Sequence, residues 1–387
     1  MQEQPAPKSG PLTGLTVVEM AGLGPVPLAS LMLAEMGADV IRIERMHSER
    51  AFLDNIAPEH DLDRHGRAVL RVDLKQPEGV AFVLRLIDKA DVLVEGFRPG
   101  VMERLGLGPE MAMARNPGLI YGRMTGFGQH GPLSERAGHD VTYLAYSGIL
   151  HAIGSKGAKP LPPLNLVADY GGGTMFLIAG VLAALFERSR SGKGQVIDAA
   201  MTDGAAMLAA PYHAWMAAGH WVDRRGQNLL DSGTPFYDTY ETADRKHIVV
   251  ACLEPQFFAE FARLLPLDRS FVAAQYDRSR WEEMRSAIAK RVAEKSRDEW
   301  AAHFEATDAC VAPVLSLLEA RDHPHNRARR TFTQAGGLRR PSPAPRFSRT
   351  PSAPAESDTL DPAAALQRYG FSAAELAALA KSGIVGR

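Results

Sequence analysis

The segment 124–175 combines residues that could transfer protons with residues that free the backbone to approach a ligand. It reads MTGFGQHGPLSERAGHDVTYLAYSGILHAIGSKGAKPLPPLNLVADYGGGTM and is dense in glycine and proline. His139 follows Gly138, and Asp169 is followed closely by the glycines 171–173. An imidazole and a carboxylate are common general acids and bases. This segment is therefore the first candidate for a catalytic site.

The surroundings of Asp169 predict two properties of that site. Asp169 follows the apolar stretch LNLVA, so desolvation is expected to raise its pKa toward neutrality. The glycines after it, and the positive end of a helix expected to begin at Met175, predict that backbone N–H groups around Asp169 hold an oxyanion.

Each of the two residues, taken alone, fits a structural role better than a catalytic one. His139 could cap a helix or lie satisfied in the core. Asp169 could be the N-cap of the helix that follows it.

A glycine-rich turn near the N-terminus invites a different interpretation. Gly22-x-Gly24 follows an expected strand, precedes an expected helix and has Glu44 about twenty residues further on, as in dinucleotide-binding turns. Pro27 stands where the third glycine of that pattern belongs. We therefore expect a turn that merely begins a helix, and an NAD-dependent dehydrogenase is disfavoured.

Basic residues recur near the ends of the expected strands, where a phosphorylated ligand would need them. Arg98, just before Pro99, is a better candidate than Arg42, which lies within a strand. The residues of this set are Arg42, Arg45, Arg64, Arg67, Arg71, Lys75, Arg98 and Arg104. A solvated surface is the alternative for each of them.

Short apolar runs alternate with helical stretches from residue 15 onward, which is typical of βαβ units and a parallel sheet. We expect a buried helix over 175–187, whose apolar core of twelve residues, Met175 to Phe186, is shorter than a membrane span. Strands are expected over 15–20, 39–44, 68–74, 91–97, 118–124 and 195–201, and helices over 28–38 and 79–90.

The pattern changes past about residue 235 and predicts a second, smaller domain. Residues 237–253 read as a hairpin with its turn near Ala243, and the next seventy residues are mainly helical. The Pro- and Ser-rich stretch 341–355 is expected to be an extended connector. Ser372 and Glu375 form a capping-box pattern before a last helix.

Composition excludes several classes of protein. Of 387 residues, 45% are hydrophobic and 23% charged, and the formal net charge of −1 argues against nucleic-acid binding through a positive field. Two cysteines, Cys252 and Cys310, suit a reducing compartment and leave no Cys-rich zinc site. With no apolar signal core in the polar N-terminus, we expect a cytoplasmic protein with no metal and no membrane segment.

Several long motifs resemble the class III CoA-transferase superfamily and, within it, the α-methylacyl-CoA racemases. The resemblance covers about residues 11 to 350. Its motifs are PLTGLTVVEMAGLGPVPLASLMLAEMGADVIRIER, DLKQPEGVAFVLRLIDKADVLVEGFRPGVMERLGLGP, GHDVTYLAYSGILHAIG, PPLNLVADYGGGTMFL, SGKGQVIDAAMTDG and DACVAPVL.

The resemblance implies roles for particular residues. His139 and Asp169 are the acid/base pair, and Glu254 is the carboxylate that supports the histidine. Coenzyme A enters only as part of the substrate, so no separate cofactor is implied. The implied CoA contacts are Arg45, Val72, Lys75, Gly96, Phe97, Arg98, Arg104, Gly138, Asp140 and Tyr143.

The resemblance also implies an α/β fold with a Rossmann-like large domain, a smaller α+β domain and an interlocked homodimer. In that dimer each site would be shared, because Glu254 would reach His139 across chains. We assign 1–200 to the large domain, 201–235 to a linker helix, 236–325 to the small domain and 326–387 to a returning C-terminal segment.

The implied activity is interconversion of (R)- and (S)-2-methylacyl-CoA by two bases on opposite faces of the α-carbon. A CoA-transferase with Asp169 as nucleophile is the first alternative, and a non-catalytic acyl-CoA-binding protein is the second. His139, and the lack of glycine around Glu254, favour the racemase. Two departures from the racemase pattern, a long stretch between Arg45 and Asp73 and a transferase-like tail after about 355, bear on acyl-chain preference.

Overall fold

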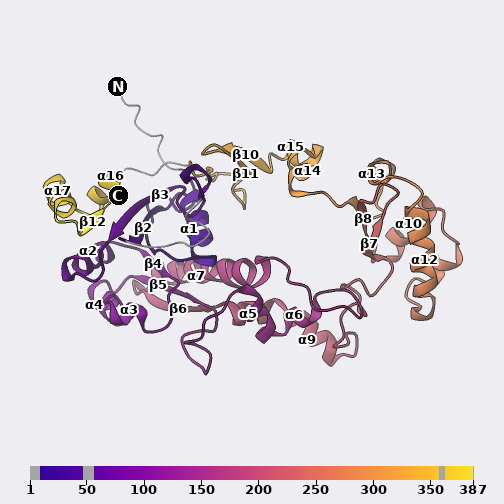
Figure 1. The fold of residues 1–387 in the computed structure, drawn as a ribbon, viewed down its shortest axis with the longest axis horizontal. Helices are drawn as coiled ribbons and strands as arrows, with labels where there is room; N and C mark the ends of the chain where they lie inside the picture. Colours follow the sequence, from indigo (N-terminus) through magenta and orange to yellow (C-terminus); the bar gives the residue numbers. More distant parts are fainter. Residues whose placement is uncertain (1–8, 47–55, 357–361, 387) are drawn as a thin grey trace. The chain divides into compact units, whose positions relative to one another are not determined.

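The computed structural model describes residues 9–46, 56–356 and 362–386 (Figure 1). The chain divides into two compact units. Unit 1 comprises Met1–Ser147, Leu164–Leu208 and His325–Arg387, and unit 2 comprises Gly148–Pro163 and Ala209–Pro324. The polar N-terminus 1–8 and the part 47–55 of the long stretch after Arg45 lie outside the described residues.

The boundary between the units differs from the expected one. The stretch 148–163, expected in the large domain, belongs to unit 2, where Arg225 donates hydrogen bonds to the carbonyls of His151 at 2.5 Å and Ala158 at 3.0 Å. The expected linker helix 201–235 is also wrong. It is two short helices, α8 (Met201–Leu208) in unit 1 and α9 (Ala210–Ala217) in unit 2.

Unit 1 is built on a seven-stranded sheet with the order β12-β3-β2-β1-β4-β5-β6. Strands β1 to β6 are parallel, and β12 pairs antiparallel with β3. The strands are β1 (Thr16–Met20), β2 (Asp39–Arg45), β3 (Arg67–Val72), β4 (Val92–Glu95), β5 (Ile120–Thr125), β6 (Gln195–Ala200) and β12 (Val385–Gly386). The order 3-2-1-4-5-6 is that of doubly wound sheets, which bind ligands where the order reverses, between β1 and β4. The predicted parallel α/β sheet is confirmed.

Helices connect and cover these strands (Figure 1). Helix α1 begins at Pro25 after Gly24 and ends before Gly37, whose φ of 103° suits glycine alone. Phe82 and Leu86 of α2 are buried against one face of the sheet. The α-helices described in the first 147 residues are α1 (Pro25–Glu35), α2 (Pro77–Ile87), α3 (Val101–Arg104), α4 (Pro109–Arg115) and α5 (Asp140–Ser147).

The other face of the sheet contains a buried ion cluster. Glu19 is paired with Arg42 and with Arg67, whose Nε lies 2.9 Å from Glu19 Oε2, and all three side chains are at most 2% exposed. Arg67 also donates to the carbonyl of Pro27 in the first turn of α1. Arg42 and Arg67 are therefore structural. For these two residues the prediction that they bind a phosphorylated ligand and the alternative of a solvated surface are both wrong, because their side chains are buried in ion pairs.

The longest helical run of unit 1 starts with a π-helix, Leu166–Thr174, which continues directly into α7 (Met175–Ser191). The expectation that this helix is buried holds for one face only, because Met175, Leu182 and Phe186 are exposed. The combined run of 26 residues is long and apolar enough to cross a membrane by length and composition alone. Core helices of soluble proteins can have the same length and composition, and one face of α7 is buried in unit 1.

Unit 2 contains a three-stranded antiparallel sheet in the order β7-β8-β9, formed by β7 (Tyr237–Glu241), β8 (His247–Ala251) and β9 (Val311–Pro313). The predicted hairpin is confirmed, with its turn closed by Thr242 and Lys246. Aromatic residues such as Phe258, Phe261 and Trp300 form the core. The helices are α6 (Ile149–Ala152), α9, α10 (Pro255–Leu264), α11 (Ser270–Ala273), α12 (Trp281–Val292), α13 (Arg297–Phe304) and α14 (Leu317–Asp322).

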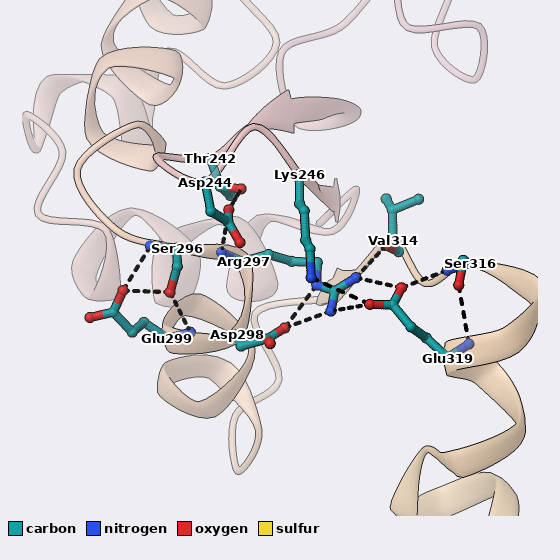
Figure 2. Close-up of polar contacts among 10 residues, drawn as sticks. All are labelled: Thr242, Asp244, Lys246, Ser296, Arg297, Asp298, Glu299, Val314, Ser316 and Glu319. Atoms are coloured by element: carbon teal, nitrogen blue, oxygen red, sulfur yellow. Dashed lines mark hydrogen bonds and ion pairs between the residues drawn. The ribbon is translucent and has the colours of Figure 1, made fainter.

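Arg297 joins α13 to the end of β9 and to α14 (Figure 2). Its guanidinium donates to both carboxylate oxygens of Glu319, at 2.8 and 2.9 Å, and to the carbonyl of Val314. Glu319 also accepts the Ser316 N–H at the start of α14 and lies 3.4 Å from Lys246 Nζ. These bonds hold the pKa of Glu319 far below its usual value, chiefly through Arg297.

The C-terminal part returns to unit 1. After α15 (Pro324–Ala328), a hairpin of β10 (Phe332–Ala335) and β11 (Leu338–Pro341) leads into the connector. Arg340 of β11 and the N–H of Ala355, at the end of the connector, both donate to the carboxylate of Glu35 in α1. Helices α16 (Pro362–Arg368) and α17 (Ala373–Lys381) follow, and the predicted capping box of Ser372 and Glu375 is confirmed.

Candidate active site

A cavity of about 800 Å³ in unit 1 lies at the reversal point of the sheet. Its wall includes Gly24 after β1 and Phe97 after β4, the two strands between which the order reverses. His139 and Asp169 line the same cavity. The fold therefore brings together two candidate acid/base residues that are thirty positions apart in the sequence.

Asp169 lies in the π-helix and is partly buried. Burial raises the pKa of its carboxyl group above the ordinary value, and the negative charge of Asp140 raises it further. A hydrogen bond from Asn165 Nδ2 at 3.3 Å and the proximity of His139 act in the opposite direction. The predicted rise of the Asp169 pKa by desolvation is thus confirmed in direction.

His139 precedes α5, and its backbone is fixed while its side chain is exposed at the cavity. Its N–H donates to Thr142 Oγ1 at 2.8 Å, and that hydroxyl donates back to the His139 carbonyl at 2.6 Å. The Tyr143 hydroxyl donates to the carbonyl of Gly138 at 2.5 Å. The backbone of His139, and not its side chain, therefore makes the hydrogen bonds at the start of α5. The imidazole is left available for chemistry at the cavity.

The prediction that backbone N–H groups around Asp169 hold an oxyanion is wrong. The N–H groups of Ala168 and Asp169 both donate to Asp140 Oδ2, each at 2.9 Å. Gly172 is buried against α8, where a Cβ atom would lie 2.6 Å from the Ala205 nitrogen. The glycines after Asp169 therefore allow close packing of two helices. They also lie inside a continuous helical run and not at a free helix N-terminus.

Half of the implied CoA contacts line the cavity. They are Gly96, Phe97, Arg98, Gly138 and Tyr143. Arg45, at the end of β2, places its guanidinium 5.6 Å from the centroid of the Phe97 ring. Lys75 is exposed between β3 and α2, and Arg104 is exposed as the last residue of α3. Arg98 lies at the cavity and Arg42 does not, which agrees with the preference for Arg98 over Arg42 drawn from the sequence.

Two implied CoA contacts, Val72 and Asp140, have buried side chains and stay predictions. Val72 is 1% exposed and packs in the core beside Val385 of β12. Asp140 is 5% exposed and bonds to the backbone of the π-helix. The side chain of neither residue is available to a ligand, so any contact they make with CoA would come from their backbone.

Glu95 supports the loop that carries Phe97. It is fully buried at the end of β4, and its carboxylate accepts the Phe97 N–H at 2.7 Å and Arg123 Nε at 3.0 Å. Burial raises the pKa of Glu95 to about 7, against the effect of these two hydrogen bonds.

Glu254 belongs to unit 2. It is exposed at the N-cap of α10, and its side chain makes no capping hydrogen bond. Its implied partnership with His139 stays a prediction.

Sequence reasoning gave no role in this site to three residues of the cavity wall, although it had singled out Gly24 as part of a turn. Gly24 has a positive φ of 72° and faces Asp169. Asn165 bonds to the Asp169 carboxylate, and Arg136 adds a cation to the wall. The helical spacing of four between Asn165 and Asp169 was the available signal for Asn165. Arg136, three positions before His139, could have been added to the set of basic residues.

Metal ligands and disulfides do not feature in the described part of the chain. No group of three His, Cys, Asp or Glu side chains gathers there in a way that could hold a metal ion. Cys252 is buried and Cys310 is exposed, and both are free thiols.

The fold and this cavity define a doubly wound α/β protein with two candidate acid/base residues on a cavity where its strand order reverses. The family model for CoA-transferase family III matches residues 12–362, and the chain belongs to this family. It is 45% identical to the alpha-methylacyl-CoA racemase of Mus musculus over 381 residues, which cover 97% of each chain. It is 43% identical to the Homo sapiens protein of the same name, over 94% of this chain and 95% of the relative.

More distant relatives show the range of the family. The acetyl-CoA:oxalate CoA-transferase of Acetobacter aceti is 31% identical over 87% of this chain and 89% of its own. A crystal structure of a CaiB/BaiF family protein from Brucella suis aligns with a TM-score of 0.79 and 26% identity, over 94% of this chain and 100% of that one.

Proposed function

We propose that this chain is a racemase that interconverts (R)- and (S)-2-methylacyl-CoA thioesters. The observation that carries the proposal is that His139 and Asp169 line one cavity, and that burial raises the pKa of Asp169. The chain that holds this cavity is 45% identical to a protein named alpha-methylacyl-CoA racemase. A carboxylate with a raised pKa is a stronger base than an exposed one.

The reaction moves one proton off the α-carbon and returns one to its opposite face. One base takes the α-proton, the electron pair of the C–H bond passes into the thioester enolate, and the other base delivers its own proton to the far side of that carbon. His139 and Asp169 exchange these roles between the two directions. Arg98 and the Phe97 loop would hold the CoA part of the substrate, since charge-assisted bonds to phosphate are strong.

One experiment tests this activity against the transferase alternative. The protein is incubated with a single enantiomer of a 2-methylacyl-CoA, with and without free carboxylic acids, and the products are separated on a chiral column. The proposal predicts racemisation that does not depend on added acid. Acyl-CoA formed from the added acid, with the starting configuration retained, would instead support an Asp169 nucleophile.

We propose a homodimer as the working assembly. Large exposed apolar side chains on the π-helix and on the two helices that contact it, α7 and α8, support it, because exposed apolar surface commonly marks interfaces. These side chains are Leu166, Met175, Leu182, Phe186, Met207 and Leu208. Co-expression of His139→Ala with Glu254→Gln should restore some activity if two chains share each site. A fully active monomer in sedimentation would contradict the dimer.

The proposed reaction transfers only protons, so it requires no redox cofactor, and coenzyme A arrives with the substrate. We further propose a location in the cytoplasm, which the two free cysteines support because they suit reducing conditions. A role in lipid metabolism is proposed from the acyl-CoA substrate of the proposed reaction.

A further inference from the structure

Asp140 connects the two segments that carry the candidate bases. It follows His139 directly, begins α5, and is 5% exposed. Its Oδ2 atom accepts the N–H of Ala168 and that of Asp169, each at 2.9 Å. A single buried carboxylate thus ties the backbone beside His139 to the backbone of Asp169.

The π-helix explains why an acceptor is needed at this point. N–H groups in the first turn of a helix have no partner within the helix, and a π-helix, which bonds five residues back, leaves more of them free than an α-helix. Ala168 and Asp169 are the third and fourth residues of Leu166–Thr174. An ionised carboxylate binds such N–H groups more strongly than a neutral acceptor. Asp140 therefore caps the π-helix from another helix.

We propose that Asp140 is a positioning residue for the racemisation, one that fixes the location of Asp169 relative to His139. This inference rests on the proposed function. Asp140 is absent from the cavity wall, so it acts through Asp169 and not on the substrate. Transfer between two bases on opposite faces of one carbon depends steeply on their separation, because small displacements of catalytic groups cost large factors in rate.

The same carboxylate acts on Asp169 through its charge. Burial is the main cause of the raised pKa of Asp169, and the Asp140 charge adds to it, while Asn165 and His139 oppose it. Loss of the Asp140 charge should therefore lower the pKa of Asp169.

In an Asp140 variant, neither Tyr143 nor Arg98 would supply a negative charge near Asp169 in place of the Asp140 carboxylate. The phenol of Tyr143 also lines the cavity, and burial, with the Asp169 charge second, raises its pKa to about 12, so it is neutral across the working range. Arg98 acts on Tyr143 as an opposing positive charge. A shift of the Asp169 pKa in an Asp140 variant can thus be assigned to the lost carboxylate.

The test compares Asp140→Asn with wild type and with Glu110→Gln. The asparagine keeps the shape and one oxygen acceptor for the two N–H groups but removes the charge. Glu110 is an exposed acid in the first turn of α4 (Pro109–Arg115), so its variant controls for loss of a helix-terminal charge elsewhere. The readouts are kcat, KM and the pH profile of racemisation, together with circular dichroism to establish folding.

Asp140→Asn should lower kcat roughly tenfold to a hundredfold with KM nearly unchanged, and should move the acidic limb of the kcat profile to lower pH. Glu110→Gln should match wild type. A folded Asp140→Asn protein with wild-type kcat and pH profile would overturn the positioning role while the racemase stands. A wild-type protein without racemisation would overturn the proposed function itself, and the positioning role with it.

Discussion

Gly24 offers a sensitive test of how the cavity holds Asp169. It lies between β1 and α1 with φ 72° and ψ −115°, a backbone conformation that residues with a Cβ atom rarely adopt. A Cβ atom at this position would lie 3.2 Å from Asp169 Oδ2 and 3.7 Å from its Cγ. Gly24→Ala should therefore strain the turn and displace the carboxylate.

The size of each effect follows from this geometry. The backbone strain should cost roughly 1–3 kcal/mol of stability. A contact of 3.2 Å requires Asp169 to move by a few tenths of an ångström, which is less than the 1 Å misplacement that costs about a hundredfold. We expect kcat to fall on the order of tenfold while KM for acyl-CoA changes little.

Gly22→Ala is the matched control, because it lies in the same turn. A Cβ atom on Gly22 would meet no neighbouring heavy atom of the described residues within 4 Å. The φ angle of Gly22 also lies outside the region that favours glycine. Racemisation kinetics and thermal unfolding of both variants would be measured together. Equal kcat values for Gly22→Ala and Gly24→Ala would refute the claim that Gly24 makes room for the Asp169 carboxylate.

Two further predictions concern the ion clusters that support each unit. Glu19→Gln leaves Arg42 and Arg67 buried without their shared carboxylate and should cost about 3–5 kcal/mol, measured as a lower urea midpoint with an unchanged slope. In unit 2, the ion pair between Arg297 and Glu319 (Figure 2) lowers the pKa of Glu319 in the folded protein. The pair therefore stabilises the folded state fully at pH values above the ordinary glutamate pKa of 4.5, and this stabilisation is lost progressively as the pH falls below that value. Glu319→Gln should therefore lower Tm at pH 7 but approach wild type near pH 2 to 3, and a Tm gap that stays constant with pH would contradict this assignment.

Local patterns were sufficient to predict the framework of unit 1. The apolar run before Gly22 and the alternating runs after it mark the strands, and parallel pairing follows from the helices between them. Membership of 148–163 in unit 2 could not be predicted, because it depends on hydrogen bonds from Arg225, more than sixty positions away.

The site shows the same division between local and long-range information. The types and neighbours of His139 and Asp169 were enough to propose an acid/base pair. The spacing could not show that Asp140 occupies the N–H groups expected to bind an oxyanion, since that contact spans 28 residues. It also could not show that Gly172 packs against α8 and not against a ligand.

Solvent deuterium exchange tests the two-base account most directly. Each enantiomer of a 2-methylacyl-CoA is incubated in D₂O with wild type, His139→Ala and Asp169→Ala, and α-deuterium and configuration are measured together. The account predicts that wild type incorporates deuterium while it racemises both enantiomers. Each variant should lose racemisation and retain slow exchange with one enantiomer only, opposite for the two variants. Racemisation that survives either substitution, or wild-type turnover without α-deuterium, would contradict it.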